Sequence, residues 1–383
     1  MLRLFCGLAG ILCVWGRATA APPPVRLQCN QTLKAGSTLA LTDKLDLSGR
    51  QPDQPQSIQG PCGIYGPIGD EAATILVPAN DCVLLAQGEV TITGNIRFVV
   101  GTKIRQFDCC DDGEGHGGIL CSYSNLTIAE NARVSIQTTD DTVVLNPGAF
   151  WTGKSIHVHG TVNASLKNGQ ITGLNGILSS TAVHITSNGH IVGSGMDTIR
   201  GAAIQGGDGG TIIEGTVECK NFTSGDSGGC VAAGNNLTFA SSGIIRASNG
   251  YNVDGGGVVL NGGKLADFQG TLVANNISST QDAGAIFTGD AITMSNTGSI
   301  IATNVYAGGG PSVIASEQII VKDFAKIVVN GSWGGDAGAI GGTLLTMKGD
   351  AKVRCENAVA AGAGGCIGSS IVMSERASIM ARN

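Results

Sequence analysis

An apolar residue preceded by small residues returns about every 27 positions through the last two thirds of the chain. Most of these anchors directly follow a pair of Gly or Ala residues. The ten anchors are Ile119, Phe150, Ile177, Ile204, Cys230, Val258, Ile286, Val313, Ile340 and Cys366. A fixed period of this length predicts a solenoid, because one short repeat cannot bury its own apolar face and neighbouring repeats must stack on it.

Within each repeat, apolar and other residues alternate over a short stretch that begins about six residues after the anchor. Leu126 and Ile128 form one such pair, and Ile292 and Met294 form another. Alternation with a period of two predicts a strand with one buried face, and no long helical pattern separates the anchors. The sequence therefore predicts an all-β protein, a single-stranded right-handed parallel β-helix with coils of about 27 residues.

The composition supports this prediction. Sixty of the 383 residues are Gly, which suits corners that need a positive φ or that pack too closely for a Cβ. The mean hydropathy of +0.19 is too high for a disordered chain. The net charge of −6 disfavours nucleic acid as a partner.

Residues 1–20 have the pattern of a secretory signal peptide. Arg3 precedes an apolar run over 4–15, and an A-x-A cleavage pattern follows at 18–20. No other stretch approaches 18 uninterrupted apolar residues, so no transmembrane segment is expected. We therefore expect a secreted protein, located extracellularly or at the cell surface.

The rest of the chain divides in two. Residues 21–108 lack the regular anchor and are rich in Pro over 52–67, which predicts an N-terminal cap and irregular first coils. Parallel β-helix repeats are expected over 109–383. The sequence stops at Asn383 in mid-coil, which predicts either a truncated C-terminus or an uncapped coil suited to end-to-end self-association.

Ten of the twelve cysteines lie beyond the predicted signal peptide, an even number that fits an oxidising compartment. Three pairs share a separation of 11 residues and are expected to form disulfides: Cys110 and Cys121, Cys219 and Cys230, Cys355 and Cys366. Three connectivities remain open for the other four, Cys29, Cys62, Cys82 and Cys109. Zinc is the competing interpretation, and the absence of C-x-x-C or Cys/His finger spacing favours disulfides.

Asparagines recur in two patterns. Seven N-x-S/T sequons predict glycosylation sites in a secreted chain: Asn30, Asn125, Asn163, Asn221, Asn236, Asn276 and Asn330. Seven asparagines lie nine or ten residues before an anchor: Asn168, Asn221, Asn249, Asn276, Asn304, Asn330 and Asn357. Stacked at one corner of the coils, these side chains would form an amide ladder.

The asparagine ahead of a small-small-apolar element resembles the repeats of the polymorphic membrane proteins, chlamydial surface adhesins with a β-helical passenger. The resemblance covers about residues 110–383 and includes Gly201-Ala202-Ala203-Ile204 and Gly338-Ala339-Ile340. The spacing of Val273 and Asn276 is similar to the F-x-x-N motif of that family. The resemblance implies surface display or adhesion, with a host-cell or matrix component as partner.

A serine motif and a group of three histidines are further candidates for chemistry. Gly225-Asp226-Ser227-Gly228-Gly229 matches the nucleophile motif of trypsin-like proteases, but the repeat phase places Ser227 at a corner two coils from His184, which argues against a catalytic triad. His157 and His184 share one phase and are expected to stack on adjacent coils, facing outward with His159. A metal site is the weaker interpretation, and a solvated surface is favoured.

Asp226, Asp254 and Asp282 each lie four residues before an anchor. If the coils stack at about 4.8 Å, neighbouring carboxylates repel by about 1 kcal/mol per pair in water. A bound Ca²⁺ would offset this repulsion. Asx-turns, in which each carboxylate accepts a nearby N–H, are the preferred interpretation, so no cofactor is expected.

An acidic segment near the start of the repeats resembles the motifs of polygalacturonases, which are also β-helical. Paired carboxylates can cleave a glycosidic bond when they lie on either side of it. The candidate catalytic residues are Asp111, Asp112, Glu114 and His116. The alternative is an acidic loop closed by a disulfide between Cys110 and Cys121.

The sequence favours a secreted or cell-surface β-helical repeat protein with a structural, adhesive or glycan-binding role and no catalysis. The alternative is a polysaccharide lyase or glycoside hydrolase on a pectinase-like β-helix. Sugar platforms usually need exposed Trp or Tyr, and beyond residue 20 the chain has only Trp151, Trp333 and four tyrosines. This scarcity favours the first interpretation, with a surface component or a polysaccharide as partner.

Overall fold

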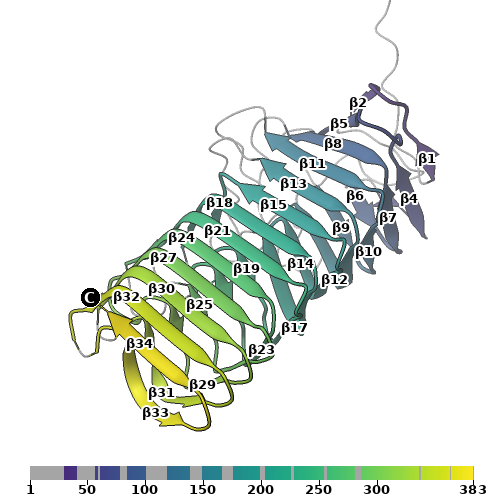
Figure 1. The fold of residues 1–383 in the computed structure, drawn as a ribbon. Helices are drawn as coiled ribbons and strands as arrows, with labels where there is room; N and C mark the ends of the chain where they lie inside the picture. Colours follow the sequence, from purple (N-terminus) through teal and green to yellow (C-terminus); the bar gives the residue numbers. More distant parts are fainter. Residues whose placement is uncertain are drawn as a thin grey trace, which may run out of the picture.

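The computed structural model describes residues 30–40, 57–58, 61–77, 84–100, 119–138, 149–165, 176–198, 203–225, 228–253, 257–280, 286–335, 338–362 and 364–382. Within these ranges every regular element is a β-strand. The strands wind into about 10 turns of roughly 27 residues. The chain is therefore a parallel β-helix, as predicted, and its first and last described strands lie at opposite ends (Figure 1).

The strands form two long sheets, and all strand pairings among the described residues are parallel. The 20-stranded sheet contains β1 (Gln31–Thr32), β3 (Ser57–Ile58), β4 (Cys62–Tyr65), β6 (Leu84–Ala86), β7 (Val90–Thr93), β9 (Leu120–Ser122), β10 (Leu126–Ile128), β12 (Phe150–Val158), β14 (Leu178–Ile185), β17 (Ile204–Ile213), β19 (Val231–Ala232), β20 (Asn236–Phe239), β22 (Leu260–Asn261), β23 (Leu265–Phe268), β25 (Phe287–Thr288), β26 (Ala291–Met294), β28 (Ile314–Ala315), β29 (Gln318–Val321), β31 (Ile340–Met347) and β33 (Ile367–Met373).

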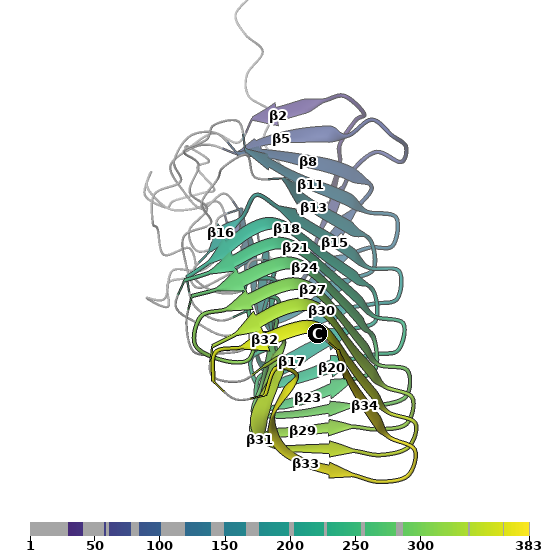
Figure 2. The same ribbon diagram turned by 60° about the vertical axis from the view of Figure 1, so that its left-hand side comes forward.

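The 14-stranded sheet covers another face of the coils (Figure 2). It contains β2 (Thr38–Ala40), β5 (Ala73–Val77), β8 (Asn95–Val100), β11 (Arg133–Thr138), β13 (Thr161–Ser165), β15 (His190–Ser194), β16 (Asp197–Thr198), β18 (Thr216–Ser224), β21 (Ile244–Asn252), β24 (Thr271–Ser279), β27 (Ser299–Ala307), β30 (Lys326–Gly334), β32 (Lys352–Ala360) and β34 (Ser378–Arg382).

The described parts of residues 21–108 form coils of the same solenoid. β1 pairs with β4 and β2 pairs with β5, so these strands extend the two sheets of the repeats. Their coils are less regular: Asn125 bonds to Glu89 from 36 positions away, whereas stacked partners nearer the C-terminus are 27 or 28 positions apart. The described parts of residues 21–108 thus continue the solenoid with coils of uneven length, and an N-terminal cap within 21–108 stays a prediction.

Alternate residues of the strands point inward and form one continuous apolar core along the solenoid. Phe239, Phe268 and Phe287 come from three successive coils and pack against one another inside it, with ring centroids 4.7 Å and 5.6 Å apart. Each ring is fully buried. Phe268 lies in register with Phe239 on the preceding coil and with Met294 on the next coil. A repeated apolar position therefore becomes a continuous column of side chains, which is the physical reason for the period of the sequence.

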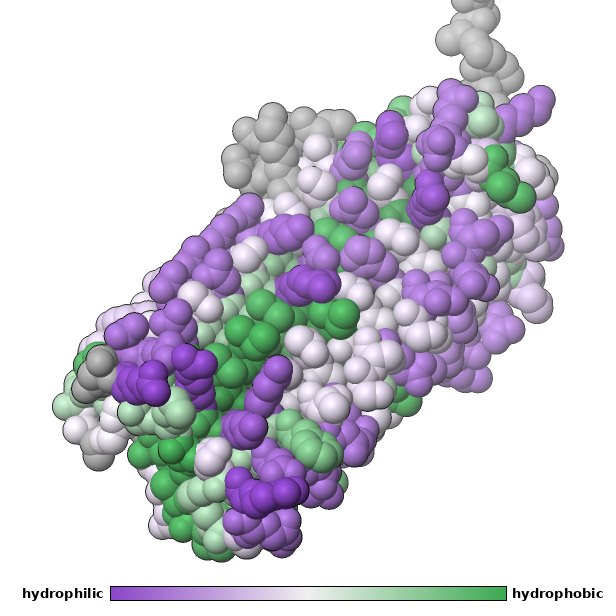
Figure 3. Space-filling view, in the orientation of Figure 1, coloured by the Kyte–Doolittle hydropathy of each residue, from purple (hydrophilic) through white to green (hydrophobic). Residues whose placement is uncertain are grey.

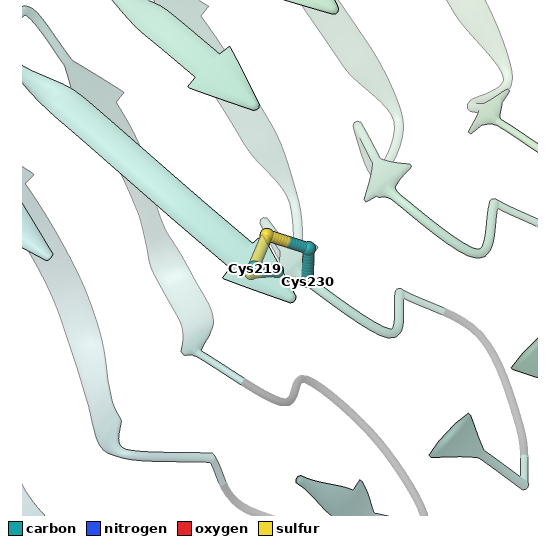
Figure 4. The surroundings of a disulfide bond; sticks show 2 residues. All are labelled: Cys219 and Cys230. Carbon is teal, nitrogen blue, oxygen red and sulfur yellow. A yellow bond between two sulfur atoms is a disulfide. The ribbon is translucent and has the colours of Figure 1, made fainter. Parts of the chain in front are cut away.

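Two disulfides staple a corner of the coil, as the spacing of 11 residues predicted. Cys219 of β18 joins Cys230, which directly precedes β19 (Figure 4), with Cα atoms 5.8 Å apart. Cys355 of β32 joins Cys366 in the equivalent place, with Cα atoms 5.7 Å apart. Cys62 and Cys121 each take part in a disulfide as well. The remaining cysteines of these predictions, Cys29, Cys82, Cys109 and Cys110, lie outside the described residues.

Candidate functional site

The asparagine ladder predicted from the repeat phase runs along the 14-stranded sheet. Asn249 donates from Nδ2 to Oδ1 of Asn221 at 2.9 Å, Asn276 donates to Asn249 at 3.3 Å, and Asn304 donates to Asn276 at 3.2 Å. These four residues are exposed and have φ values of 50–54°. Asparagine suits the position because it tolerates a left-handed backbone, and because its amide carries both a donor and an acceptor for identical neighbours.

One predicted member of the ladder is displaced. The register pairs Thr303 with Asn330, so Gly331, with a φ of 68°, occupies the ladder position next to Asn304. The prediction for Asn330 was therefore wrong by one residue, because Gly adopts a positive φ without the steric cost of a Cβ. Asn330 instead accepts a bond from Nδ2 of Asn357 at 3.5 Å. Asn168 lies outside the described residues.

A column of aromatic side chains lies beside the ladder. Two positions after each ladder residue, the register aligns Tyr251, Ser278, Tyr306, Trp333 and Val359 on β21, β24, β27, β30 and β32. Tyr251 is 41% exposed and Tyr306 is 47% exposed, and Trp333 is half-buried. The rings of Tyr306 and Trp333 stack with centroids 4.6 Å apart and planes 8° apart. We call these five aligned positions the aromatic column, because three of them hold a Tyr or a Trp.

The aromatic column and the ladder together offer two kinds of contact. Only one buried position, occupied for example by Ile277 or Val305, separates them along each strand. Aromatic faces carry partial negative charge and attract the C–H groups of a sugar ring, and amides can bond to its hydroxyls. The same C-terminal coils carry a band of hydrophobic residues on the face shown in Figure 3. The aromatic column and the asparagine ladder together therefore suit a ligand with alternating apolar and hydroxyl faces.

A groove of about 740 Å³ runs across five coils of the 20-stranded sheet and is lined mostly by glycines and by residues with polar side chains. Its wall includes Lys264, Asp290 and Glu317, which lie at equivalent places on successive coils. Gly263 lines the groove with a φ of 65°. A Cβ on Gly263 would overlap the carbonyl oxygen of Gly234 in the preceding coil, which explains why Gly lines the groove there.

A line of hydrogen bonds crosses the earlier coils of the same sheet. Nδ2 of Asn125 donates to Glu89 at 3.0 Å, and the hydroxyl of Ser155 donates to Oδ1 of Asn125 at 2.9 Å. Nε2 of His157 lies 3.0 Å from the same hydroxyl oxygen. Because Ser155 has one proton and donates it to Asn125, His157 must act as the donor to Ser155. This arrangement does not make Ser155 a nucleophile activated by His157.

The histidines stack as the sequence predicted. His157 pairs in register with His184, with ring centroids 5.8 Å apart, and its ring lies 6.5 Å from that of His159. Nε2 of His184 lies 3.3 Å from a carboxylate oxygen of Glu214, and the two groups form an ion pair when the imidazole is protonated. Among the described residues, no group of three or more His, Cys, Asp or Glu side chains could hold a metal ion.

Protonation of His157 is expected to destabilise the fold. Burial of the imidazole, followed by the neighbouring charges of His184 and His159, lowers the pKa of His157 from its ordinary value of 6.5, and Glu89 opposes this shift. Because the unfolded chain binds this proton more tightly, the stability that neutral His157 contributes is complete above about pH 6.5 and is lost as the pH falls towards the lowered pKa.

Thermal unfolding at pH 7 and pH 5 can measure this effect. We expect the melting temperature of the native protein to fall more on acidification than that of a His157→Gln variant, which lacks the titrating group. His190→Gln serves as the control, because His190 lies on the other sheet. Equal falls in the native protein and the His157→Gln variant would contradict the assignment.

The sequon asparagines divide by their contacts. Asn221 and Asn276 belong to the ladder, and Asn125 bonds to Glu89 and Ser155. Asn163 on β13 and Asn236 on β20 are exposed on outward positions of their strands. Glycosylation at these two positions would leave the ladder intact.

Several predicted sites lie outside the described residues: Asp111, Asp112, Glu114, His116, Asp226, Ser227, Asp254 and Asp282. Among the described residues no helix is long and apolar enough to span a membrane. Comparison of the chain with protein-family models, curated proteins and solved structures gives no match. A functional assignment therefore rests on the surfaces themselves.

Proposed function

We propose that this protein is a secreted or cell-surface β-helical repeat protein that binds polysaccharide along its C-terminal coils. Its role would be attachment or extracellular structure, without catalysis. The observation that carries the proposal is the aromatic column beside the asparagine ladder. Tyr251, Tyr306 and Trp333 are half of the Trp and Tyr residues beyond residue 20, and one register position gathers all three.

The repetition of the coil favours a polymeric ligand. Each contact of a sugar with an aromatic ring or an amide is worth about 1 kcal/mol. A polysaccharide that lies along the solenoid makes several such contacts at once, so the later contacts form at high effective concentration. The parallel β-scaffold already holds the side chains in place, which reduces the entropy lost on binding.

The location of the protein is proposed on two grounds. Residues 1–20 have the pattern of a signal peptide, and the chain carries disulfides, which persist in oxidising compartments. A secreted binder would meet polysaccharides of a cell surface or an extracellular matrix.

Affinity electrophoresis in gels that contain pectin, alginate or β-glucan tests the proposal. We expect at least one polysaccharide to retard the native protein, and a Tyr306→Ala/Trp333→Ala double variant to lose at least tenfold in affinity. Trp151→Ala is the matched control, because Trp151 packs against Tyr123, outside the aromatic column. Equal retardation of the native protein and the double variant, or no retardation by any of the three polymers, would contradict the proposal.

Polysaccharide cleavage is the second candidate function, and the groove is the observation that favours it. Asp290 and Glu317 lie on adjacent coils within the groove, and glycosidases use two carboxylates that flank the scissile bond. Release of reducing sugars from the same three polymers, lost in an Asp290→Asn variant, would assign catalysis to this groove. Sugar release that persists in Asp290→Asn and disappears in Asp112→Ala would assign it to the acidic segment predicted from the sequence.

A further inference from the structure

The aromatic column contains one small residue between two tyrosines. The register places Ser278 of β24 between Tyr251 of β21 and Tyr306 of β27. We propose that Tyr251 and Tyr306 are the walls, and Ser278 the floor, of a slot that receives one pyranose ring of a polysaccharide. This inference rests on the proposed glycan-binding function and defines a single sugar subsite within it.

The stacking of Tyr306 on Trp333 establishes the direction in which the Tyr306 ring faces. The two ring planes are 8° apart and their centroids are only 4.6 Å apart. Two coplanar rings cannot approach this closely, because carbon atoms in contact are already about 3.5–4.0 Å apart. The rings are therefore face to face along the direction in which the coils stack. Trp333 covers one face of Tyr306, and the other face points towards the coil of Ser278.

The spacing of the coils sets the width of the slot. Parallel strands lie about 4.8 Å apart, so the coils of Tyr251 and Tyr306, two steps apart, are separated by about 9.6 Å. A ligand ring that touches both walls needs about 7–8 Å for its two carbon contacts. The remaining space, on the order of 2 Å, suits a puckered ring with axial hydrogens better than a flat one. A saturated sugar ring fits this description.

Polar groups line the approach to the slot. Asn249, Asn276 and Asn304 lie two residues before Tyr251, Ser278 and Tyr306 on the same three strands. Each ladder bond uses one of the two Nδ2 hydrogens of its donor and one of the two lone pairs on the oxygen of its acceptor. The amides therefore keep donors and acceptors for the hydroxyls of a bound sugar.

Filling the slot tests the inference. In a Ser278→Tyr variant, the new ring would occupy the space between Tyr251 and Tyr306 and complete a continuous aromatic stack. Ser135→Tyr is the control, because it adds the same ring at an outward-facing position of β11, on the same sheet but outside the aromatic column. Calorimetric titration with hexasaccharides prepared from pectin, alginate and β-glucan is expected to show at least a tenfold loss of affinity for Ser278→Tyr and less than a threefold change for Ser135→Tyr.

A second variant covers the case in which Ser278→Tyr disturbs the fold. Tyr251→Ala removes one wall and is expected to lose at least tenfold in affinity for the same hexasaccharide, whereas Trp151→Ala, outside the aromatic column, keeps the affinity. Native-like binding by both Ser278→Tyr and Tyr251→Ala would overturn the slot and leave the proposed polysaccharide binding in place. Failure of the native protein to bind any hexasaccharide or parent polymer would overturn both.

Discussion

Replacement of Phe268 by Ala is expected to lower the free energy of unfolding by about 3–5 kcal/mol. The ring is fully buried between Phe239 and Phe287, so truncation removes apolar contacts and leaves a cavity between two neighbouring coils. Urea denaturation followed by far-UV circular dichroism measures the loss. Phe324→Ala provides the control, because Phe324 is 66% exposed and its removal should cost less than about 0.5 kcal/mol.

This comparison tests whether the repeated apolar column holds the coils together. Each coil contacts only its neighbours, so a cavity at one position weakens the interfaces on both sides. Similar midpoints for Phe268→Ala and Phe324→Ala would show that the packing of Phe268 does not hold the coils together.

Replacement of Gly263 by Ala is expected to cost about 2–6 kcal/mol. A left-handed backbone at a residue with a Cβ costs roughly 1–3 kcal/mol, and forcing an atom into a packed site adds roughly 1–3 kcal/mol. Gly263 has a φ of 65°, and its new Cβ would overlap the carbonyl oxygen of Gly234. The melting temperature and the urea midpoint of the purified variant measure the effect.

Gly289→Ala is the matched control in the same groove. A Cβ at position 289 would lie 3.2 Å from its nearest neighbour, the carbonyl oxygen of Gly263, and the φ of Gly289 is not positive. The expected loss is below about 1 kcal/mol. If both alanine variants are as stable as the native protein, the coils at this groove do not pack too closely for a Cβ at position 263, which would contradict the account.

The fold and the ladder could be predicted because a solenoid turns sequence phase into spatial position. Residues that share a phase stack on adjacent coils, so counting from the anchors brought Asn221 next to Asn249 and His157 next to His184. The count misplaced Asn330 because Gly331 takes the left-handed position in that coil. Phase alone does not show which of two neighbouring residues forms the bend.

The aromatic column could be predicted from the positions of its residues in the repeat, but not from the composition of the chain. Tyr251, Tyr306 and Trp333 each lie seven residues before an anchor, whereas the total number of aromatics suggested a poor sugar platform. The series of hydrogen bonds from Glu89 to His157 could not be predicted, because the early coils vary in length and the phase of Glu89 cannot be counted from an anchor. The groove also required coordinates, since it depends on how the turns between short strands pack.

Fluorescence of Trp333 tests the central claim, polysaccharide binding at the aromatic column, most directly. Beyond residue 20 the chain has two tryptophans, so a Trp151→Phe variant without residues 1–20 leaves Trp333 as the only indole. We predict that a polysaccharide that retards the protein in gels shifts the Trp333 emission to shorter wavelength with saturation, because sugar displaces water from the ring. An emission spectrum that stays unchanged while the same polysaccharide is bound would contradict the account.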